Sequence, residues 1–290
     1  MYDVIIIGRG PAGLSASLYT ARANLKTLII GKYDSRLLKA DRVDNYFGFS
    51  SSISGEQLLS AGEQQAQRFG VEIVEDEVIA LEKEDFYRVT ASKGQYTAKA
   101  LLLATGQPQK KVKIENLSEF EGKGVSYCAT CDGFFYNNLK VGVLGFKDYA
   151  MHEASDLLAN TSNIVIYTNG KELDISEAFR ETARQFSVNT KPIAKIDGGE
   201  FLQRIHFNDG TSEELDGLFV AYESPSTLDF ARTMGILADG STVVVDRKQQ
   251  TNLEGVFAAG DCAAELKQVS VAVGQGAIAG KAIVEYVRSL

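Results

Sequence analysis

Two cysteines separated by two residues are the strongest chemical signal in the sequence. Cys128 and Cys131 enclose Ala-Thr and are followed directly by Asp132. Such a pair can form a reversible disulfide, or it can supply two of the four ligands of a zinc ion. Zinc would need two further ligands, and the only histidines, His152 and His206, do not form a paired ligand pattern. The spacing therefore predicts a redox-active disulfide and no metal site.

Other residues near the pair have candidate roles. Opening a disulfide requires thiols to lose and gain protons, and Asp132 is the candidate proton donor and acceptor. The alternative is that Asp132 is only a turn residue beside Gly133. The aromatic run at 134–136 is expected in a core, with a partner-binding groove as the alternative. The third cysteine, Cys262, is interpreted as a small packed residue without a redox role.

Composition and charge limit the kind of protein. The 290 residues are 44% hydrophobic and 23% charged, which is typical of a globular chain with two domains. The net charge of −8 argues against nucleic acid and anionic membranes as partners. No apolar run approaches the roughly 18 residues that span a bilayer. The chain starts with a strand-like run and no basic leader, and it has too few cysteines for a secreted scaffold, so we expect a cytoplasmic protein.

A glycine-rich turn follows the first apolar segment. Residues 3–7 form a β-branched run typical of a buried parallel strand, and the turn Gly-Arg-Gly-Pro-Ala-Gly occupies 8–13. A helical stretch to residue 23 and a second strand at 27–30 follow. In this context the glycines allow a tight turn, close approach of a pyrophosphate and close helix packing. The segment predicts a dinucleotide site, and a turn without a ligand is the alternative.

The same unit recurs 137 residues later. Strands are expected at 140–144 and 163–168, with a turn at 145–150 and a helix at 151–159 between them. The shift places Gly145 on Gly8, Lys147 on Gly10 and Ala150 on Gly13. A lysine side chain in place of the middle glycine would keep a dinucleotide pyrophosphate away from the backbone. The second strand ends in Tyr-Thr-Asn-Gly-Lys, without the arginine typical of NADP sites or the acidic residue typical of NAD sites. The repeat therefore predicts that the fold is kept and the pyridine nucleotide site is lost.

The end of the chain returns to the first unit. Residues 251–261 form a strand that runs into an Ala-Gly-Asp turn, and a Gly/Ala-rich helix is expected at 273–287. Asp261 can accept a hydrogen bond from a ribityl hydroxyl or from a water on a pyrophosphate. Its alternative role is that of N-cap of the last helix.

Four segments, in this order, resemble bacterial-type thioredoxin reductases. They are Gly-Arg-Gly-Pro-Ala-Gly at 8–13, Leu-Ala-Thr-Gly at 103–106, Gly-Val-Ser-Tyr-Cys-Ala-Thr-Cys-Asp-Gly at 124–133 and Val-Phe-Ala-Ala-Gly-Asp at 256–261. The resemblance runs from Met1 to about Arg288, and the block around the cysteines is highly specific. It implies an α/β fold of two Rossmann-like nucleotide-binding domains, the second inserted in the first. The implied boundaries are 1–113 with 245–290 for the FAD-binding domain and 114–244 for the inserted domain.

The resemblance also implies a cofactor, partners and roles. It implies FAD, thioredoxin as the substrate and a homodimer, with Cys131 facing the flavin and Cys128 attacking thioredoxin. The sequence itself does not rank the two sulfurs. The residues implied for FAD binding are Gly8, Gly10, Pro11, Ala12, Gly13, Asn45, Ala104, Thr105, Gly106, Gly260, Asp261, Gln268 and Ala277.

Departures from the family indicate a different electron donor. The NADPH glycine motif and the paired arginines are missing, residues 222–227 differ from the family's loop, and residues 32–37 lack the Gly-Gly-Gln motif. This set of losses resembles the subgroup of ferredoxin-dependent flavin thioredoxin reductases. Ferredoxin gives one electron at a time, whereas a disulfide takes two, and a flavin can convert between them. We therefore expect ferredoxin as the electron donor and thioredoxin as the acceptor.

Ferredoxins are strongly acidic, so docking would need a local basic surface. Residues 22–42 carry a net charge of +4 in a chain of net −8. The basic side chains are Arg22, Lys26, Lys32, Arg36, Lys39 and Arg42. Lys110, Lys111 and Lys113 form a second cluster. Ordinary solvated faces are the alternative explanation for both.

Three other functions, and one variant of the leading hypothesis, are compatible with the same residues. One is an NADPH-dependent thioredoxin reductase with an atypical nucleotide site, in which Lys147 and Lys171 would meet phosphates. Another is a flavin disulfide oxidase that passes electrons from thiols to oxygen. A third is a redox sensor or binding protein without turnover, which the intact cysteine motif disfavours. In a variant of the leading hypothesis, another ligand occupies the vacated nucleotide pocket.

Overall fold

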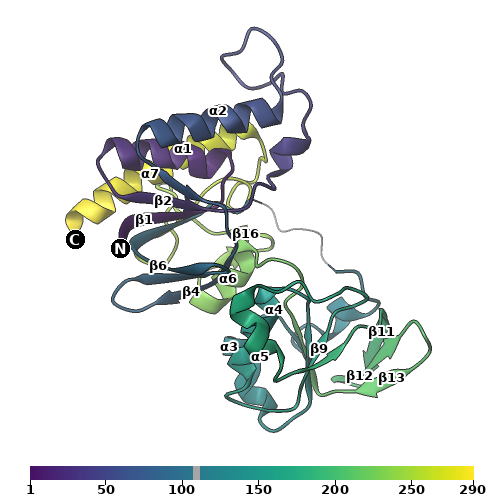
Figure 1. The fold of residues 1–290 in the computed structure, drawn as a ribbon. Helices are drawn as coiled ribbons and strands as arrows, with labels where there is room; N and C mark the ends of the chain where they lie inside the picture. The colour runs from purple at the N-terminus through teal and green to yellow at the C-terminus, as the bar shows by residue number, and fades with distance from the viewer. Residues whose placement is uncertain (107–111) are drawn as a thin grey trace. The chain divides into compact units, whose positions relative to one another are not determined.

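The computed structural model describes residues 1–106 and 112–290 (Figure 1). The chain divides into two compact units. The outer unit comprises Met1–Pro108 and Ser226–Leu290, and the inserted unit comprises Gln109–Pro225. Each unit has its own sheet and apolar core. The predicted fold class, two Rossmann-like α/β units of which one interrupts the other, is confirmed. Among the described residues, no helix combines the length and the apolar character needed to cross a bilayer.

The outer unit is built on a seven-stranded sheet of order β3-β2-β1-β6-β5-β4, with β17 also paired to β6. The strands are β1 (Tyr2–Ile7), β2 (Thr27–Ile30), β3 (Glu72–Val74), β4 (Val78–Lys83), β5 (Tyr87–Ala91), β6 (Gly94–Leu103) and β17 (Val256–Ala258). β1, β2, β3, β6 and β17 are parallel to one another, and β4 and β5 form an antiparallel extension. Residues 4–7 of β1 are buried, as expected for a central parallel strand covered on both faces.

Three helices lie on one face of this sheet: α1 (Pro11–Arg22), α2 (Gly55–Arg68) and α7 (Val269–Ser289) (Figure 1). α7 begins at Val269 rather than at the predicted residue 273. Its glycines allow backbone contact with α1, because an added Cβ at Gly276 would lie 2.2 Å from the Ala12 carbonyl oxygen. At Gly280 the corresponding distance to the Ala16 oxygen is 2.6 Å. The last helix of the chain is thereby held against the helix that follows the first glycine turn.

The segment after residue 225 belongs to the outer unit, which differs from the predicted return at residue 245. It forms α6 (Thr227–Met234), β15 (Ala238–Asp239) and β16 (Thr242–Val243). Phe230 and Val243 are buried in one apolar cluster with Ile5 and Leu28 of the outer sheet. Short, mostly polar segments of this kind carry no sequence signal for the sheet on which their few apolar side chains pack.

The inserted unit has two sheets. Its parallel sheet has the order β10-β9-β8-β14-β7 and its antiparallel sheet the order β11-β12-β13. The strands are β7 (Val125–Ser126), β8 (Val141–Leu144), β9 (Ile164–Tyr167), β10 (Ser187–Asn189), β11 (Ile193–Gly198), β12 (Leu202–Phe207), β13 (Ser212–Glu214) and β14 (Gly217–Val220). Its α-helices are α3 (Ala129–Asp132), α4 (Asp148–Leu157) and α5 (Arg180–Ala183). The part of the chain that the structure describes also has short 3-10 helices, namely η1 (Arg36–Lys39), η2 (Leu117–Phe120), η3 (Gly133–Tyr136) and η4 (Glu177–Phe179).

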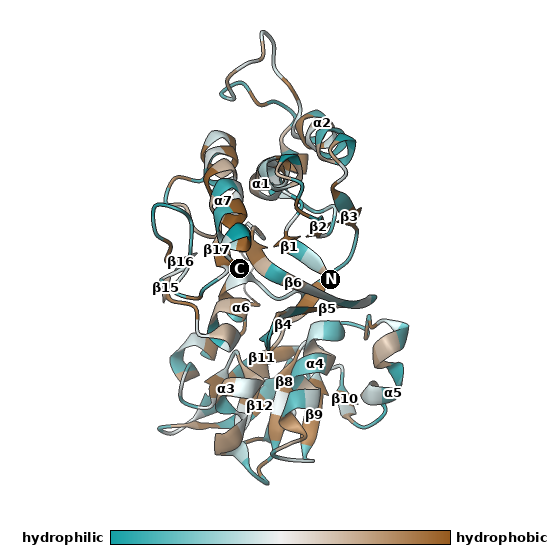
Figure 2. Cartoon of the chain, turned by 90° about the vertical axis from the view of Figure 1, so that its left-hand side faces the viewer, coloured by the Kyte–Doolittle hydropathy of each residue, from teal (hydrophilic) through white to brown (hydrophobic). Residues whose placement is uncertain are grey.

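The internal repeat is visible in the strand register. Val4 pairs with Thr27 across β1 and β2, and Val141 pairs with Ile164 across β8 and β9. Both pairs are related by the shift of 137 residues that the sequence predicts. Apolar residues fill these parallel strands, and in Figure 2 they are brown in β9, whereas hydrophilic residues, in teal, lie along α2. The two units therefore share the same βαβ arrangement and strand register but differ in their side chains.

Candidate functional site

The first glycine turn forms an open cradle at the carboxyl edge of the outer sheet. Gly8 has φ = +121°, and a Cβ there would lie 2.1 Å from the Ala104 carbonyl oxygen, so only glycine fits. A Cβ on Gly13 would lie 2.2 Å from the Gly8 oxygen. Gly10, in contrast, faces space, because among the described residues the one heavy atom within 4 Å of an added Cβ is the Ser35 Oγ, at 4.0 Å. The turn is tight on both sides of Gly10 and open at Gly10 itself.

The open side of the turn is suited to an anion. Gly10 is the N-cap of α1, and no side chain caps this helix end. Pro11 at the first helical position fixes the backbone without offering an N–H group. The free N–H groups of the first turn and the helix dipole therefore face the cradle. Arg9 is directed elsewhere, because its Nε binds the Glu63 carboxylate at 2.6 Å and its Nη1 binds Glu75 at 3.2 Å.

The other predicted cofactor residues fall at the same edge of the sheet. Ala104, Thr105 and Gly106 follow β6, and Gly260 and Asp261 follow β17, beside each other because β6 and β17 are paired. The first three also follow a strand that neighbours β1, at whose end the glycine turn begins. Carboxyl ends of neighbouring parallel strands form the usual ligand site of this fold.

Two residues far apart in the sequence meet near this edge. The Asn45 Nδ2 donates to the Gln268 Oε1 at 2.9 Å, and Gln268 is the N-cap of α7. The predicted alternative for Asp261, an N-cap of the last helix, is therefore not observed. Ala277 lies farther along α7, beside Gly276, so it is the predicted cofactor residue most removed from the strand ends. The roles of all these residues in binding stay predictions.

Three further residues of the edge escaped the sequence analysis. Ser35 lies opposite Gly10, as described above. Gln275 accepts a hydrogen bond from the Gly260 N–H at 2.9 Å and fixes the turn after β17. Thr227, the first residue of α6, hydrogen-bonds through its hydroxyl to the hydroxyl of Thr105. A polar glutamine among the small residues of α7 is the one signal that could have been noticed. The arrangement as a whole, an open glycine cradle with an uncapped helix end, fits the FAD that the resemblance implies.

The second glycine turn keeps the backbone of the first. The Gly145 N–H donates to the Tyr167 oxygen at 3.0 Å, as the Gly8 N–H donates to the Ile30 oxygen at 2.9 Å. A Cβ on Gly145 would lie 2.2 Å from the Ala221 oxygen, which matches the constraint on Gly8. Lys147 is the N-cap of α4 with extended backbone angles, the position that Gly10 has at α1. The lysine side chain therefore starts where the first turn leaves an open cradle.

Aromatic side chains and hydrogen bonds close the rest of this second turn. Phe146 is buried and packs edge-to-face on Tyr222 with ring centroids 5.2 Å apart. The Lys147 ammonium lies 5.4 Å from the centre of the Phe146 ring. The segment after β9 folds back on the turn, since the Asp174 N–H donates to the Phe146 oxygen at 2.8 Å and the Ser176 N–H donates to the Asp148 carboxylate at 2.7 Å. The second turn is therefore covered by side chains and by the segment after β9, whereas a dinucleotide site needs an open turn.

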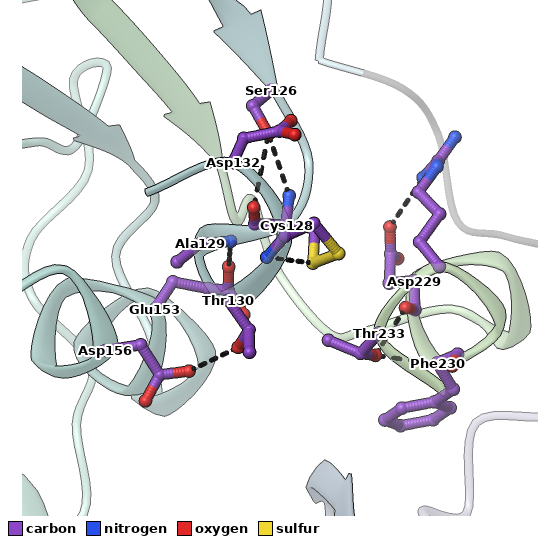
Figure 3. The surroundings of a disulfide bond; sticks show 12 residues. Ser126, Cys128, Ala129, Thr130, Asp132, Glu153, Asp156, Asp229, Phe230 and Thr233 are labelled. Carbon is purple, nitrogen blue, oxygen red and sulfur yellow. Dashed lines mark hydrogen bonds and ion pairs between the residues drawn. A yellow bond between two sulfur atoms is a disulfide. The ribbon is translucent and has the colours of Figure 1, made fainter. Parts of the chain in front are cut away.

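Cys128 and Cys131 form a disulfide in the inserted unit (Figure 3). Their Cα atoms are 5.3 Å apart, and Cys128 is the N-cap of the short helix α3. The Cys131 N–H donates to the Cys128 Sγ at 3.1 Å. Cys128 is buried and Cys131 is exposed. The predicted redox pair is thus in bonding geometry on a helix that follows β7 directly.

Asp132 lies beside the disulfide. Its carboxylate accepts a hydrogen bond from the Ser126 Oγ at 2.6 Å, and the same oxygen of Ser126 accepts from the Cys128 N–H at 3.1 Å (Figure 3). Burial, and then the negative charge of Asp132, raise the pKa of the nearby Tyr136. The carboxylate is thereby linked through one hydroxyl to the backbone N–H of Cys128, and its role in proton transfer stays a prediction.

The aromatic pair after the disulfide is not in the core. Phe134 and Phe135 are each 72% exposed, and their rings pack edge-to-face at 6.1 Å. The prediction that they belong to the core of the inserted unit is therefore wrong. The 3-10 helix η3 turns them outward and directs Tyr136 inward, where it packs on Phe219.

Cys262 is isolated from this chemistry. It is 2% exposed, and its Sγ donates to the Leu103 carbonyl oxygen at 3.4 Å. Burial raises the pKa of the Cys262 thiol to about 11, so the thiolate is disfavoured. The interpretation of this cysteine as a packed residue agrees with its surroundings.

Comparisons with known proteins relate the whole chain to one family. The model of the pyridine nucleotide-disulphide oxidoreductases matches residues 2–276. The thioredoxin reductase of Treponema pallidum is 35% identical over 308 residues, covering 100% of this chain and 98% of the relative. The crystal structure of the atypical thioredoxin reductase TRi from Desulfovibrio vulgaris Hildenborough is 41% identical with a TM-score of 0.96, covering 100% of this chain and 99% of that one. That of a ferredoxin-flavin thioredoxin reductase from Clostridium acetobutylicum is 28% identical with a TM-score of 0.70, covering 100% and 99%.

Proposed function

Because the chain belongs to the thioredoxin reductases of the pyridine nucleotide-disulphide oxidoreductase family, which are FAD flavoproteins with a redox disulfide, we propose that it reduces thioredoxin with electrons from a ferredoxin-type donor rather than from NADPH. The observation that carries the choice of donor is Lys147 at the position of Gly10 in an otherwise equivalent turn. A pyrophosphate needs the bare backbone that glycine gives at this point. The likeness to a ferredoxin-flavin thioredoxin reductase supports the same proposal.

The reaction follows from the cysteine pair. FAD, when bound, supplies the conversion between single electrons from the donor and the electron pair that a disulfide accepts. The Cys128–Cys131 bond takes up two electrons and two protons and becomes a dithiol. One thiolate then attacks the thioredoxin disulfide and forms a mixed disulfide between the two proteins. The second cysteine attacks the enzyme's own sulfur in this mixed disulfide, so that thioredoxin leaves as the dithiol and the Cys128–Cys131 bond forms again. Asp132 is the residue proposed to exchange protons with the cysteine thiols during these steps.

Thioredoxin docking is proposed at the exposed pair of Phe134 and Phe135. Both rings follow the redox helix α3 directly in the chain, and large exposed aromatic side chains are typical of binding surfaces. A docking site close to the disulfide would bring the two reacting pairs within reach of each other. The homodimer that the resemblance implies stays a prediction.

Anaerobic reduction of the flavin tests the donor directly. We expect that a tenfold excess of NADPH or NADH leaves the flavin absorbance near 450 nm unchanged for minutes, whereas reduced ferredoxin bleaches it within the mixing time. The physical reason is the loss of the pyrophosphate contact at the second turn. Thioredoxin added to the ferredoxin-reduced enzyme should restore the absorbance. Bleaching by NADPH at a rate that supports turnover would overturn the choice of donor and favour an atypical nucleotide site. Peroxide formation from dithiols would instead favour a disulfide oxidase.

The basic residues between 22 and 42 do not form one surface. α1 runs back from the carboxyl edge of the sheet, so Arg22 and Lys26 lie at the amino edge, where β2 begins. Lys32, Arg36, Lys39 and Arg42 follow β2 and lie at the carboxyl edge with the cradle. Of the second predicted cluster, Lys110 and Lys111 lie outside the described residues.

Ferredoxin docking is therefore proposed at the carboxyl-edge group. Lys32 already pairs with Glu77 at 2.6 Å, whereas Lys39 is exposed and Arg42 makes surface contacts, to Asp44 at 3.4 Å and to the Ser52 Oγ at 3.1 Å. We expect the double change Lys39→Glu with Arg42→Glu to lower ferredoxin-driven kcat/KM about tenfold at low salt, because steering between opposite charges is lost. The difference should shrink above roughly 0.3 M salt.

The amino-edge pair provides the matched control. Arg22→Glu with Lys26→Glu makes the same change in net charge and is expected to alter kcat/KM less than about twofold. Stopped-flow reduction of the flavin by ferredoxin at several salt concentrations measures both variants. Equal losses in the two double variants would show a general charge effect and remove the proposed docking surface.

A further inference from the structure

A buried carboxylate holds the helix that carries the disulfide. Glu153 on α4 is 4% exposed, and its Oε2 accepts a hydrogen bond from the Ala129 N–H at 2.7 Å (Figure 3). Ala129 is the first residue of α3, directly after Cys128. Nothing in the sequence marks Glu153, because a glutamate in a predicted helix is ordinary and its partner lies 24 residues away.

The same face of α4 contacts α3 at two further points. The Asp156 carboxylate accepts from the Thr130 Oγ1 at 3.0 Å. A Cβ on Gly133 would lie 3.2 Å from the Leu157 side chain, so the end of α3 packs closely on the end of α4. Glu153 and Asp156 also form, with His152, a cluster of potential metal ligands, but both carboxylates already accept hydrogen bonds from α3. In the structure, the Glu153 and Asp156 carboxylates hydrogen-bond to α3 and so hold the helix that carries the disulfide.

The position of Glu153 affects the cysteines in two ways. Ionised, Glu153 places a negative charge in a buried position beside Cys128, where low dielectric strengthens repulsion between like charges. It also occupies the Ala129 N–H, a group at a helix N-terminus that could otherwise stabilise a Cys128 thiolate. On this side of α4, Glu153 and Asp156 are acidic, and the titratable His152 lies against Asp156 with its Nδ1 3.7 Å from the carboxylate; Asp132 of α3 adds a third carboxylate. The Cys131 N–H, which donates to the Cys128 Sγ, favours the thiolate, whereas the charge of an ionised Glu153 and its hydrogen bond to Ala129 both disfavour it.

We propose that Glu153 is a positioning residue whose charge shifts the Cys128–Cys131 couple toward the disulfide and so makes the dithiol a stronger reductant of thioredoxin. The inference rests on the proposed function, since it concerns the same disulfide. A redox couple whose thiolate is stabilised is a strong oxidant, and one whose thiolate is disfavoured is a strong reductant. The step in question is the uptake of two electrons and two protons by the disulfide, which is reversed when thioredoxin receives them.

The test is a redox titration of the holoenzyme in buffers of reduced and oxidised dithiothreitol, with acid quenching, alkylation and mass spectrometry to count free thiols. Glu153→Gln keeps an oxygen that can accept from Ala129 but removes the charge. It is expected to move the dithiol–disulfide equilibrium about tenfold toward the dithiol, which corresponds to about 30 mV. Glu153→Ala, which also lacks the charge, should shift it at least as far. Glu153→Asp retains the charge and should stay within about threefold of the wild type.

Asp156→Asn is the matched control, because it neutralises a carboxylate three residues away on the same helix face at a more exposed place. Its equilibrium should stay within about twofold of the wild type. The proposal is overturned if both neutral Glu153 variants keep the wild-type equilibrium, or if Asp156→Asn shifts it as far as Glu153→Gln does. The titration uses no ferredoxin, nicotinamide nucleotide or thioredoxin. Its failure therefore leaves the proposed donor and substrate untouched, and failure of those proposals leaves the titration valid.

Discussion

Replacing either Cys128 or Cys131 with serine is expected to lower steady-state reduction of thioredoxin by a factor on the order of 1,000. A single thiol cannot re-form the intramolecular disulfide that resolves the mixed disulfide with thioredoxin, so each enzyme molecule stops after one attack. Flavin reduction by the electron donor should persist in both variants, since the predicted FAD site lies in the outer unit and not at the cysteines. Turnover of thioredoxin with ferredoxin as donor, or with dithionite in its place, measures the loss.

The two serine variants also rank the sulfurs. The resemblance assigns the attack on thioredoxin to Cys128, but the structure buries Cys128 and exposes Cys131. The exposed fractions favour the opposite assignment, so Cys128→Ser is expected to form the mixed disulfide with an activated monothiol thioredoxin faster than Cys131→Ser does. Cys262→Ser is the control and should keep at least half of the wild-type turnover, because its thiol is buried with a pKa of about 11. Retention of more than a tenth of the turnover in either redox-pair variant would contradict the proposed dithiol mechanism.

Replacing Gly10 with valine is expected to weaken FAD binding by at least about 100-fold, or about 2.7 kcal/mol, without unfolding the protein. The backbone of Gly10 is extended, with φ = −93° and ψ = −175°, and its added Cβ would meet no atom closer than 4.0 Å in residues 1–106 and 112–290. A branched side chain therefore fits the protein and fills only the space in which the cofactor pyrophosphate approaches the backbone. Flavin content after purification, and titration of the apoprotein with FAD, measure the effect.

Substitutions at two other glycines serve as comparisons for Gly10→Val. Gly199→Val is the control, because an added Cβ there also meets nothing within 4 Å but lies in the inserted unit. It should purify with a full complement of flavin. Gly8→Ala, in contrast, should destabilise the outer unit itself, since its Cβ would collide with the Ala104 oxygen and its φ of +121° is strained for alanine. Normal flavin content in Gly10→Val would exclude the turn as the pyrophosphate site.

The sequence predicted the elements that repeat and missed those that depend on distant partners. The predicted strands and helices of both βαβ units are present, with shifts of a few residues, because local apolar runs and glycine turns specify them. The antiparallel strands β4, β5 and β11–β13 were not foreseen, since their pairing joins segments without a distinctive local signal. The assignment of α6 to the inserted unit failed for the same reason, because its partner residues Ile5 and Leu28 are more than 190 residues away.

The residues of the candidate site also fall into those that the local sequence indicates and those that depend on distant contacts. Gly8, Gly10 and the Cys128–Cys131 pair were identified because their chemistry depends on adjacent residues in the chain. Glu153 and Gln275 act through hydrogen bonds to backbone N–H groups of other elements, and nothing in their own surroundings in the sequence reports such a contact. The exposed Phe134 and Phe135 were misplaced because an apolar pair reads as core unless a partner is considered.

The way in which α7 completes the outer unit has a consequence for biosynthesis. The ribosome delivers all of residues 109–225 before it delivers the helix whose Gly276 and Gly280 pack on Ala12 and Ala16. The inserted unit, continuous in sequence, can therefore fold on the nascent chain while the first hundred residues still wait for their last strand and helix. A protein truncated after residue 268 would have a complete inserted unit but would lack α7, so its outer unit is expected to remain incomplete and to bind FAD poorly.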